Sequence, residues 1–292
     1  MKMRTFKVAL AAGLLSVCGI NSVFAEDYIS DSQSLHSFEV EATKLVETGD
    51  IESPETLLKE LERTHYSLTL PSAKDQEKSP AELFEAYKHA TVALGTLYDC
   101  GRESCRKAHV HMASGFVIHE DGIVVTNHHV MMGLAKDDRK IHSAVVRDFE
   151  GNVYPIREVL AAHEADDLAI IRVDTKGKKL KAFSLGGDVE VGDNVNVISH
   201  PKGSFYTYTK GAVTRHTMVP IGPDSPERKR INITADYAAG SSGGPVFDDC
   251  GNVIGVVCTT YSMYYHQKEQ KSLQMVVKAI IPVESLKSLI NG

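Results

Sequence analysis

The sequence lacks the basic patch or stripe that nucleic-acid-binding proteins carry. Its 292 residues hold 32 lysines and arginines against 38 aspartates and glutamates, a net charge of −6 at pH 7. The excess acid lies almost entirely in residues 26–80, which contain 13 acidic and 5 basic side chains. Internal repeats and long low-complexity linkers are also missing. We therefore expect a globular protein with no nucleic-acid partner.

The sequence also lacks an apolar run long enough to span a membrane, which takes about 20 residues. The N-terminal run Val8–Ile20 is shorter, follows three basic residues and precedes Val23-Phe24-Ala25, whose small residues resemble a cleavage site. We predict a bacterial-type signal peptide over residues 1–25, export to the periplasm or the exterior, and no membrane span after cleavage. A lipoprotein signal at Cys18 is the alternative, disfavoured by the bulky Val17 before it.

Cysteine is scarce, with four residues left after cleavage. Cys100 and Cys105 flank a four-residue loop between two strand-like runs, so we predict a disulfide between them. A strand between Cys250 and Cys258 would hold these two about 20 Å apart, and we expect them unpaired. The pair His109 and His111 could ligate zinc, but the sequence offers no third ligand, so we expect no metal and no cofactor.

The N-terminal extension, residues 26–88, is predicted to be helical. Leu35, Phe38, Ala42 and Leu45 recur at helical spacing. Ser53-Pro54 and the capping box Ser79–Glu82 mark two further helix starts. We expect these helices to pack as a prop against the main domain. The alternative is an arm that binds a partner or forms a homo-oligomer.

Short β-prone runs separated by turn residues follow from Thr91, and Val283–Ile290 forms a terminal helix after Pro282. This pattern predicts a mostly β protein, either a sandwich or a barrel. A seam is expected near residues 174–188. The predicted strands are 91–98, 110–118, 123–126, 141–149, 153–160, 168–173, 195–199, 206–213, 231–235, 253–258 and 276–281.

The stretch Gly240-Ser241-Ser242-Gly243-Gly244 contains a candidate nucleophile. It fits the G-x-S-x-G elbow of α/β-hydrolases, which requires a helix after the serine and the acid and histidine downstream. Here Pro245-Val246-Phe247 favours a strand, and only His266 lies downstream. The α/β-hydrolase interpretation therefore fails.

The alternative places the histidine and the acid upstream, in "VVTNHHVM" (124–131) and "DDLAIIRVD" (166–174). His129, Asp167 and Ser242 then follow one another at intervals of 38 and 75 residues. The order His, Asp, Ser is that of chymotrypsin-fold hydrolases.

Four blocks, "SGFVIHEDGIVVTNHHV", "DDLAIIRV", "ISHPKG…TKGAVT" and "GSSGGPVFDDCGNVIGV", resemble the trypsin-like protease domain of the HtrA/Deg group. The resemblance covers residues 85–290. It implies two Greek-key six-stranded β-barrels, about 89–175 and 185–292, within a protease domain 89–292. The active site would lie in the cleft between them.

By this resemblance His129 is the general base, Asp167 orients its imidazole, and Ser242 is the nucleophile, in preference to His128, Asp166 and Ser241. A serine needs an adjacent base to become nucleophilic, and a histidine can accept and return its proton. The segment Gly240-Ser241-Ser242 would form the oxyanion hole through the N–H groups of Gly240 and Ser242.

Two departures from related proteases stand out. Zymogen-type trypsins carry an aspartate where this chain has Ser241, so activation through that ion pair is not expected. HtrA proteins commonly carry C-terminal PDZ domains, whereas this sequence ends at Gly292 directly after the predicted terminal helix. We therefore expect no PDZ-dependent peptide sensing.

Substrate preference has two interpretations. Asp236 lies six residues before Ser242, where trypsins place the residue that selects Lys or Arg. In HtrA-like proteins the corresponding aspartate lies two residues earlier and has no such role, and small aliphatic side chains are preferred. The resemblance also implies that Cys258-Thr259-Thr260 pairs with the substrate backbone.

Together these features predict an exported serine endopeptidase that acts on polypeptides through an acyl-enzyme. The alternatives are a catalytically silent or latent protease fold used for binding or chaperoning, and a serine esterase on the same fold.

Overall fold

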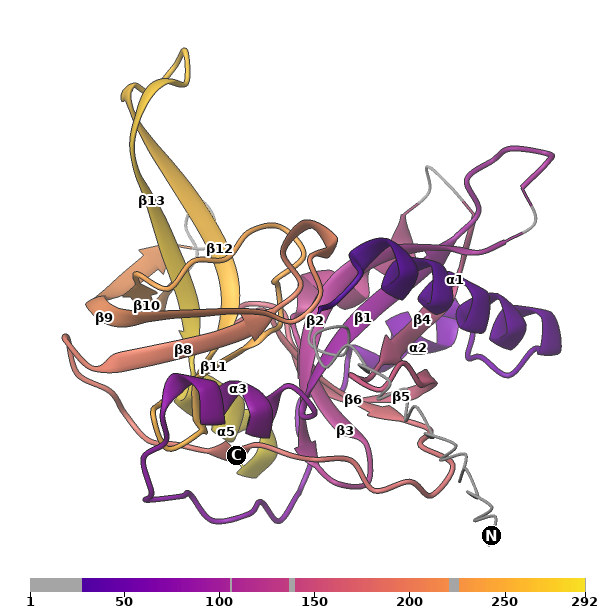
Figure 1. Cartoon of the computed structure of the whole chain (residues 1–292), viewed down its shortest axis with the longest axis horizontal. Coiled ribbons are helices and arrows are strands. Elements are labelled where there is room, and N and C mark those ends of the chain that lie inside the picture. The colour runs from indigo at the N-terminus through magenta and orange to yellow at the C-terminus, as the bar shows by residue number, and fades with distance from the viewer. Residues whose placement is uncertain (1–27, 106, 137–139, 221–225, 292) are drawn as a thin grey trace, which may run out of the picture. The chain divides into compact units, whose positions relative to one another are not determined.

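The structure is a computed structural model that describes residues 28–105, 107–136, 140–220 and 226–291; the predicted signal peptide lies outside these ranges. Residues from Asp31 onward form one compact unit of two β-sheets with helices around them (Figure 1). Within the described residues, no helix combines the length and apolar character needed to cross a membrane.

The first sheet is a closed barrel in which six antiparallel strands follow the order β1-β2-β3-β6-β5-β4. Its interior is filled by alternating apolar side chains such as Val92, Leu94, Val124 and Ile171, all fully buried. The strands are β1 (Thr91–Tyr98), β2 (His109–His119), β3 (Ile123–Thr126), β4 (Ile141–Arg147), β5 (Val153–His163) and β6 (Leu168–Val173).

The second sheet has the order β11-β8-β9-β10-β13-β12-β7, and an extra pairing between β11 and β12 joins six of its strands into a ring. The predicted two-barrel, mostly β fold is therefore confirmed, with one addition: the two-residue strand β7 pairs parallel to β12. The strands are β7 (Ser184–Leu185), β8 (Asn194–Ser199), β9 (Thr207–Pro220), β10 (Glu227–Ile233), β11 (Pro245–Phe247), β12 (Asn252–His266) and β13 (Lys271–Pro282).

Strands β12 and β13 are longer than predicted and form a hairpin that projects from the second sheet (Figure 1). The prediction ended β12 at Cys258, but pairing continues to His266↔Lys271. The outer part alternates exposed apolar and polar side chains, with Tyr261 and Met263 exposed. An exposed two-stranded ribbon lacks the nearly continuous apolar run of a buried strand. The sequence pattern therefore predicted the end of β12 at Cys258, the last buried residue of that strand.

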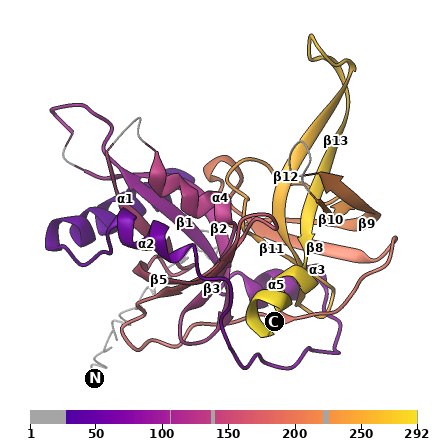
Figure 2. The same ribbon diagram turned by 180° about the vertical axis from the view of Figure 1, so that it is seen from behind.

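The N-terminal extension contains three helices, α1 (Asp31–Thr48), α2 (Pro54–Glu60) and α3 (Pro80–Tyr87). The predicted Ser53 cap and the Ser79–Glu82 capping box are both present. α1 and α2 lie against strands of the closed barrel (Figure 2). Leu57 of α2 is fully buried in the barrel core, as expected for a helix that props the domain.

Residues 63–79, which we call the strap, form neither helix nor strand, so the prediction of a helical extension over residues 26–88 is wrong there. The strap is held by backbone bonds to distant parts of the chain. The Tyr66 N–H donates to the Leu289 carbonyl (3.0 Å) in the terminal helix α5 (Val283–Asn291). The Lys78 N–H donates to the Asp249 carbonyl (2.8 Å) in the second sheet.

Tyr87, at the end of α3, locks the extension onto the protein core. Its ring stacks on Phe183 (centroids 4.6 Å apart) and contacts Phe247 (5.5 Å). It also covers Gly251, where a Cβ would lie 2.0 Å from the ring. Only glycine permits this approach, and Gly251 has a positive φ of 85° that suits glycine as well.

Candidate active site

The candidate base His129 lies where the chain leaves the closed barrel. Strand β3 ends at Thr126, Asn127 precedes the helix, and the one-turn helix α4 (His128–Met131) carries the imidazole. The Asn127 side-chain amide donates to the backbone carbonyl of Asp167 (2.9 Å), which ties the start of α4 to the β5–β6 turn.

Asp167 makes two hydrogen bonds to His129. Its Oδ1 accepts from the His129 backbone N–H (2.9 Å), and its Oδ2 lies 2.8 Å from the imidazole Nδ1. Asp167 adopts a left-handed backbone conformation with φ of 64°, which aspartate tolerates better than most residues. With the carboxylate on Nδ1, the Nε2 lone pair is left to accept a proton.

The structure separates the predicted acid from its neighbour. Asp166 Oδ2 lies 2.9 Å from His163 Nδ1, and Asp166 makes no contact with His129 among the bonds of the described residues. Of the two acids, Asp167 is therefore the one that contacts His129 in these bonds.

Cys258 contributes to the site in a way that the sequence did not indicate. Its thiol donates to Asp167 Oδ2 at 3.5 Å. Burial, and then the Asp167 charge, raise the pKa of Cys258 to about 12, so the sulfur keeps its proton and remains a donor. The S–H is a weak donor, but it faces a carboxylate that is only 18% exposed.

The candidate nucleophile segment is held through its backbone. The Ser114 N–H donates to the Ser242 carbonyl (2.9 Å), and the Ser114 hydroxyl donates to the Gly240 carbonyl (2.9 Å). The Lys202 N–H donates to the Ala239 carbonyl (2.7 Å). Ser114 belongs to the closed barrel, so this segment of the second sheet is fastened across the boundary between the two sheets.

Two glycines let the segment approach its supports. At Gly240, with φ of 97°, a Cβ would lie 2.6 Å from the His200 carbonyl oxygen. At Gly243, with φ of 83°, it would lie 2.3 Å from Thr126 Oγ1. The Ser242–Gly243 peptide therefore packs against the end of β3, three residues before His129.

The predicted oxyanion donors are the backbone N–H groups of Gly240 and Ser242. Within the described part of the chain, neither the Gly240 N–H nor the Ser242 N–H donates a hydrogen bond. The same part of the chain gives no hydrogen bond between Ser242 Oγ and His129, so the geometry assembles the His129–Asp167 pair but not the full triad. Catalytic hydrogen bonds are often long without substrate and shorten in the complex.

Ser241 is completely buried and serves the segment's structure. Its Oγ accepts from the Ser199 hydroxyl (3.0 Å) and from the Ala238 N–H (3.3 Å). These partners explain how a serine fits where zymogen-type trypsins carry an aspartate.

The loop after β8 supports the nucleophile segment through His200, which is fully buried. The His200 N–H donates to Ser114 Oγ (3.1 Å), and its Nδ1 accepts from the Tyr206 N–H (3.1 Å). Burial lowers the pKa of His200 to about 3, so the imidazole is neutral at physiological pH.

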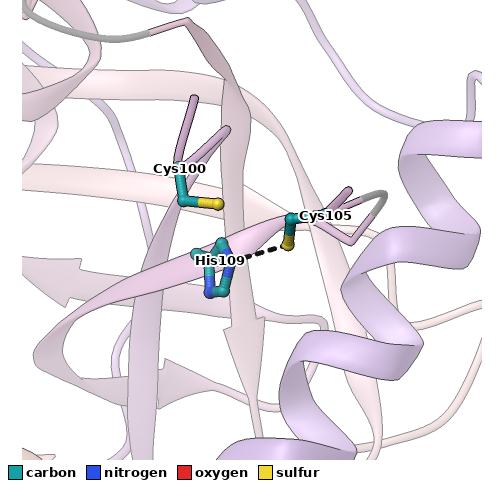
Figure 3. Close-up of side chains that lie close together, drawn as sticks. All are labelled: Cys100, Cys105 and His109. Atoms are coloured by element: carbon teal, nitrogen blue, oxygen red, sulfur yellow. Dashed lines mark hydrogen bonds between the residues drawn. The ribbon is translucent and has the colours of Figure 1, made fainter. Parts of the chain in front are cut away.

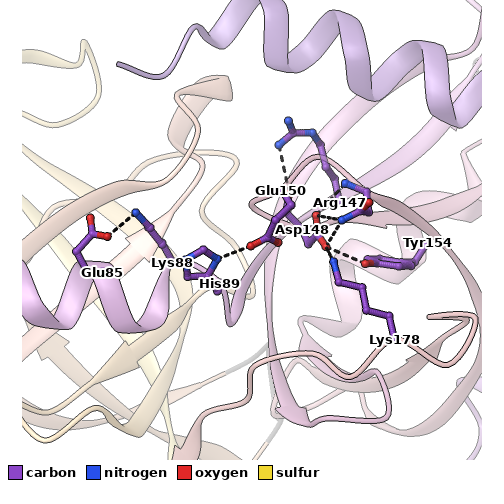
Figure 4. Close-up of polar contacts among 9 residues, drawn as sticks. Glu85, Lys88, His89, Arg147, Asp148, Glu150, Tyr154 and Lys178 are labelled. Carbon is purple, nitrogen blue, oxygen red and sulfur yellow. Dashed lines mark hydrogen bonds and ion pairs between the residues drawn. The ribbon is translucent and has the colours of Figure 1, made fainter. Parts of the chain in front are cut away.

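The turn after β4 packs on this loop. Phe149 contacts Tyr206 edge to face (4.8 Å), and the Arg147 guanidinium lies 5.1 Å from the Phe205 ring centre. Beneath them, buried Asp148 accepts from the Tyr154 hydroxyl (2.8 Å) and pairs with Lys178 (2.9 Å) (Figure 4). Burial opposes the charge of Asp148, but its hydrogen bonds outweigh burial and lower its pKa.

A groove of about 1220 Å³ runs beside His129 and Asp167. Its walls include Cys258-Thr259-Thr260 of β12, together with Leu58 of α2 and Leu61, the residue directly after that helix. The N-terminal extension thus contributes to the groove, which the sequence did not predict. Ser242 and Gly240 are not among its lining residues.

Asp236 lies apart from this groove and is exposed, with 85% of its side chain accessible. Its carboxylate lies 3.5 Å from Lys278 Nζ, and that ammonium donates to the Tyr237 carbonyl (2.6 Å). An exposed acid beside a lysine differs from a buried acid at the base of a specificity pocket.

The predicted disulfide is not formed in the structure, in which Cys100 and Cys105 are both free. Their sulfur atoms instead cluster with His109, one of the two histidines weighed as zinc ligands. His111 is not part of this cluster.

Comparisons with known proteins agree with this fold. The family described as "Trypsin-like peptidase domain" matches residues 113–256. The chain is 31% identical over 181 residues to "Protease Do-like 5, chloroplastic" of Arabidopsis thaliana, covering 59% of this chain and 54% of that protein. It is 35% identical over 156 residues to "Probable periplasmic serine endoprotease DegP-like" of Brucella suis, covering 52% of this chain and 28% of that protein.

A solved structure, "Crystal structure of Deg5", superimposes with a TM-score of 0.53 at 24% identity, covering 71% of this chain and 90% of that one. This likeness supports the fold. The alignments span about half, or less, of the length of these curated relatives.

Proposed function

We propose that this chain is an exported serine endopeptidase with Ser242 as its nucleophile, because residues 113–256 match a trypsin-like peptidase domain and its relatives include Do-like and DegP-like proteases. The observation that carries the proposal is the double hydrogen bond between Asp167 and His129, which leaves Nε2 as a proton acceptor. The names of the relatives, a chloroplastic protease and a periplasmic endoprotease, support the reaction class.

In the proposed reaction, Ser242 Oγ attacks the scissile carbonyl carbon while His129 Nε2 takes the hydroxyl proton. The N–H groups of Gly240 and Ser242, which have no internal acceptor among the described residues, receive the oxyanion. His129 then returns the proton to the leaving amine, which leaves an acyl-enzyme. Water, activated by the same imidazole, releases the product. Asp167 stabilises the imidazolium in both steps.

The groove walls support an extended peptide as substrate. Thr259 and Thr260 are exposed on β12 beside His129 and can pair with a peptide backbone. The exposed Asp236 is offset by Lys278, so we propose a preference for an uncharged residue before the scissile bond rather than for Lys or Arg. A peptide-library cleavage profile tests this preference, and cleavage mainly after Lys or Arg would contradict it.

A fluorophosphonate probe tests the nucleophile on the protein spanning residues 26–292. We expect labelling of the wild type and of Ser288→Ala, a matched control on an exposed face of α5, and no labelling of Ser242→Ala. Casein digestion should follow the same pattern.

The absence of a Ser242–His129 hydrogen bond within the described chain favours a second candidate, a latent protease fold used for binding. A wild type that neither labels nor digests casein would support that candidate and reject the active enzyme. Labelling with hydrolysis of esters alone would indicate an esterase.

A further inference from the structure

Three potential metal ligands, none of them in the proposed active site, meet at the β1–β2 hairpin (Figure 3). The ligand atoms of Cys100, Cys105 and His109 all lie within 4.8 Å of one another. Cys105 Sγ is 3.2 Å from His109 Nε2. Tetrahedral zinc, with bonds of about 2.3 Å to sulfur and about 2.0 Å to nitrogen, places such atoms roughly 3.5–3.8 Å apart. The three side chains can therefore close on one ion with small movements.

The histidine is already oriented for a metal. His109 Nδ1 lies 3.0 Å from Oε1 of Glu39, a residue of α1 that is only 7% exposed. A carboxylate on Nδ1 leaves Nε2 as the free ligand atom, the arrangement that accompanies most histidines bound to metals. Nε2 is the atom that faces Cys105. Glu39 is itself fixed by an ion pair with Lys107.

A turn shapes the loop between the cysteines, and the residues that follow it are fastened to α1. The Cys105 N–H donates to the Arg102 carbonyl (2.9 Å), and the Ala108 N–H donates to the Thr43 hydroxyl of α1 (3.0 Å). The two sulfurs thus come from a short hairpin loop that is fastened to α1.

We propose that Cys100, Cys105 and His109 bind one Zn²⁺ ion, with Glu39 as the positioning residue behind His109. Two thiolates and an imidazole suit zinc better than Mg²⁺ or Ca²⁺, which prefer oxygen ligands. The exposed side of Cys100 leaves the fourth position to water. Binding releases the thiol protons and joins the β1–β2 hairpin to α1 through Glu39.

A disulfide between Cys100 and Cys105 is the competing outcome, because it would consume two of the three ligands. The two states differ in what they bind and in mass. The zinc form carries one ion per chain and two cysteines that react with thiol reagents after chelation, whereas the disulfide form is two hydrogens lighter and binds no zinc.

The test measures zinc content and Co²⁺ titration of the 26–292 protein, purified with and without reductant. We expect one zinc per chain and, with Co²⁺, a thiolate-to-cobalt charge-transfer absorption in wild type and in Cys250→Ser, a control cysteine outside the cluster. Cys105→Ser and His109→Asn should lose the absorption. Glu39→Gln should keep both thiolates but weaken binding by about 10–100-fold.

Circular dichroism of each variant verifies that it is folded. The Glu39→Gln variant retains all three proposed zinc ligands, so it tests the positioning residue alone. A wild type that shows no thiolate absorption even when fully reduced would overturn the proposal. So would a Cys105→Ser or His109→Asn variant that binds Co²⁺ as tightly as wild type. These outcomes do not depend on protease activity, so they are separable from the test of Ser242.

Discussion

The acid–base pair and the nucleophile segment are held in different ways. On the closed barrel, His129 and Asp167 are joined to each other by two hydrogen bonds, one of them between side chains. On the second sheet, the segment around Ser242 is held by bonds to its backbone, from Ser114 and Lys202, and by glycines that allow close packing. The His129 imidazole is thus already oriented by Asp167. The Ser242 side chain, in contrast, makes no hydrogen bond to His129 within the described residues.

This difference implies that changes to the acid–base pair act on chemistry, while changes around the nucleophile act on backbone geometry. Substitutions in the two regions can separate an effect on the chemistry from an effect on backbone geometry.

Asp167→Asn should have the largest effect. The amide cannot stabilise the imidazolium and favours the wrong tautomer, so we expect kcat to fall about 10⁴-fold. Asp166→Asn removes an adjacent carboxylate that pairs with His163 instead, and should leave kcat near the wild-type value. Steady-state kinetics on one peptide substrate compares the two. Equal losses in both variants would mean that Asp167 is not the orienting acid.

Gly240→Ala tests the backbone of the nucleophile segment. The added Cβ would lie 2.6 Å from the His200 carbonyl at a φ of 97°, so the peptide must shift and its N–H must turn away. We expect kcat to fall about 10²–10³-fold, as when one oxyanion donor is lost. Gly187→Ala, where nothing lies within 4 Å of the added Cβ, is the control. Wild-type kcat in Gly240→Ala would exclude this N–H from the oxyanion hole.

His200 should make the support of the nucleophile segment sensitive to acid. Its pKa is about 3 in the folded protein and about 6.5 when unfolded, so its contribution to stability is complete above pH 6.5. As pH falls from 6.5 toward 3, the unfolded chain takes up the proton and the folded state loses up to about 1.4 kcal/mol per pH unit.

Urea unfolding of Ser242→Ala at several pH values measures this dependence without self-digestion. His200→Gln should reduce the slope of unfolding free energy between pH 6.5 and 5, whereas His65→Gln, at an exposed position, should not. An unchanged slope in His200→Gln would show that another group titrates.

Cys258 should have the smallest effect. Its S–H donates to Asp167 Oδ2 at 3.5 Å, and serine offers a stronger donor at the same place. We expect Cys258→Ser to keep the wild-type pH profile of kcat/KM. Cys258→Ala should lower kcat by a few-fold, on the order of 1 kcal/mol. If the serine variant is the weaker of the two, the contact does not position Asp167.

The sequence was sufficient for features that depend on local patterns. The caps at Ser53 and Ser79 are short-range signals, and alternating apolar residues located most strands of both sheets. The order of the histidine, aspartate and serine blocks indicated the fold, because that order differs between unrelated hydrolases.

Features that depend on distant contacts were not predictable. The strap has no regular secondary structure and its backbone bonds reach distant residues such as Ala162, Asp249 and Leu289, so no local period marks it. The contact of Cys258 with Asp167 joins residues 91 positions apart. The cluster of Cys100, Cys105 and His109 depends on the path of the β1–β2 hairpin and on the position of α1. Neither can be predicted from local sequence patterns, which suggested a disulfide between the two cysteines instead.

One turn motif occurs twice in the sequence. The turns 148–152 and 248–252 both have the form D-x-x-G-N. In each turn the first aspartate accepts from the N–H of the asparagine at 2.8 Å, and the glycine N–H donates to the aspartate carbonyl at 3.1 Å. One turn leads into β5 of the first sheet and the other into β12 of the second, so the two sheets share this turn motif.

The strap also fixes the order in which this chain can finish folding. The Tyr66 N–H bonds to Leu289 and the Lys78 N–H to Asp249, so these two bonds cannot form until nearly the whole chain exists, whereas the Arg63 carbonyl already finds the Ala162 N–H in the closed barrel. Such long-range closure slows folding. Until the second sheet and α5 are made, the strap is held only at its start, by the closed barrel against which α2 also packs. A molecule truncated before residue 289 would lack that last fastening.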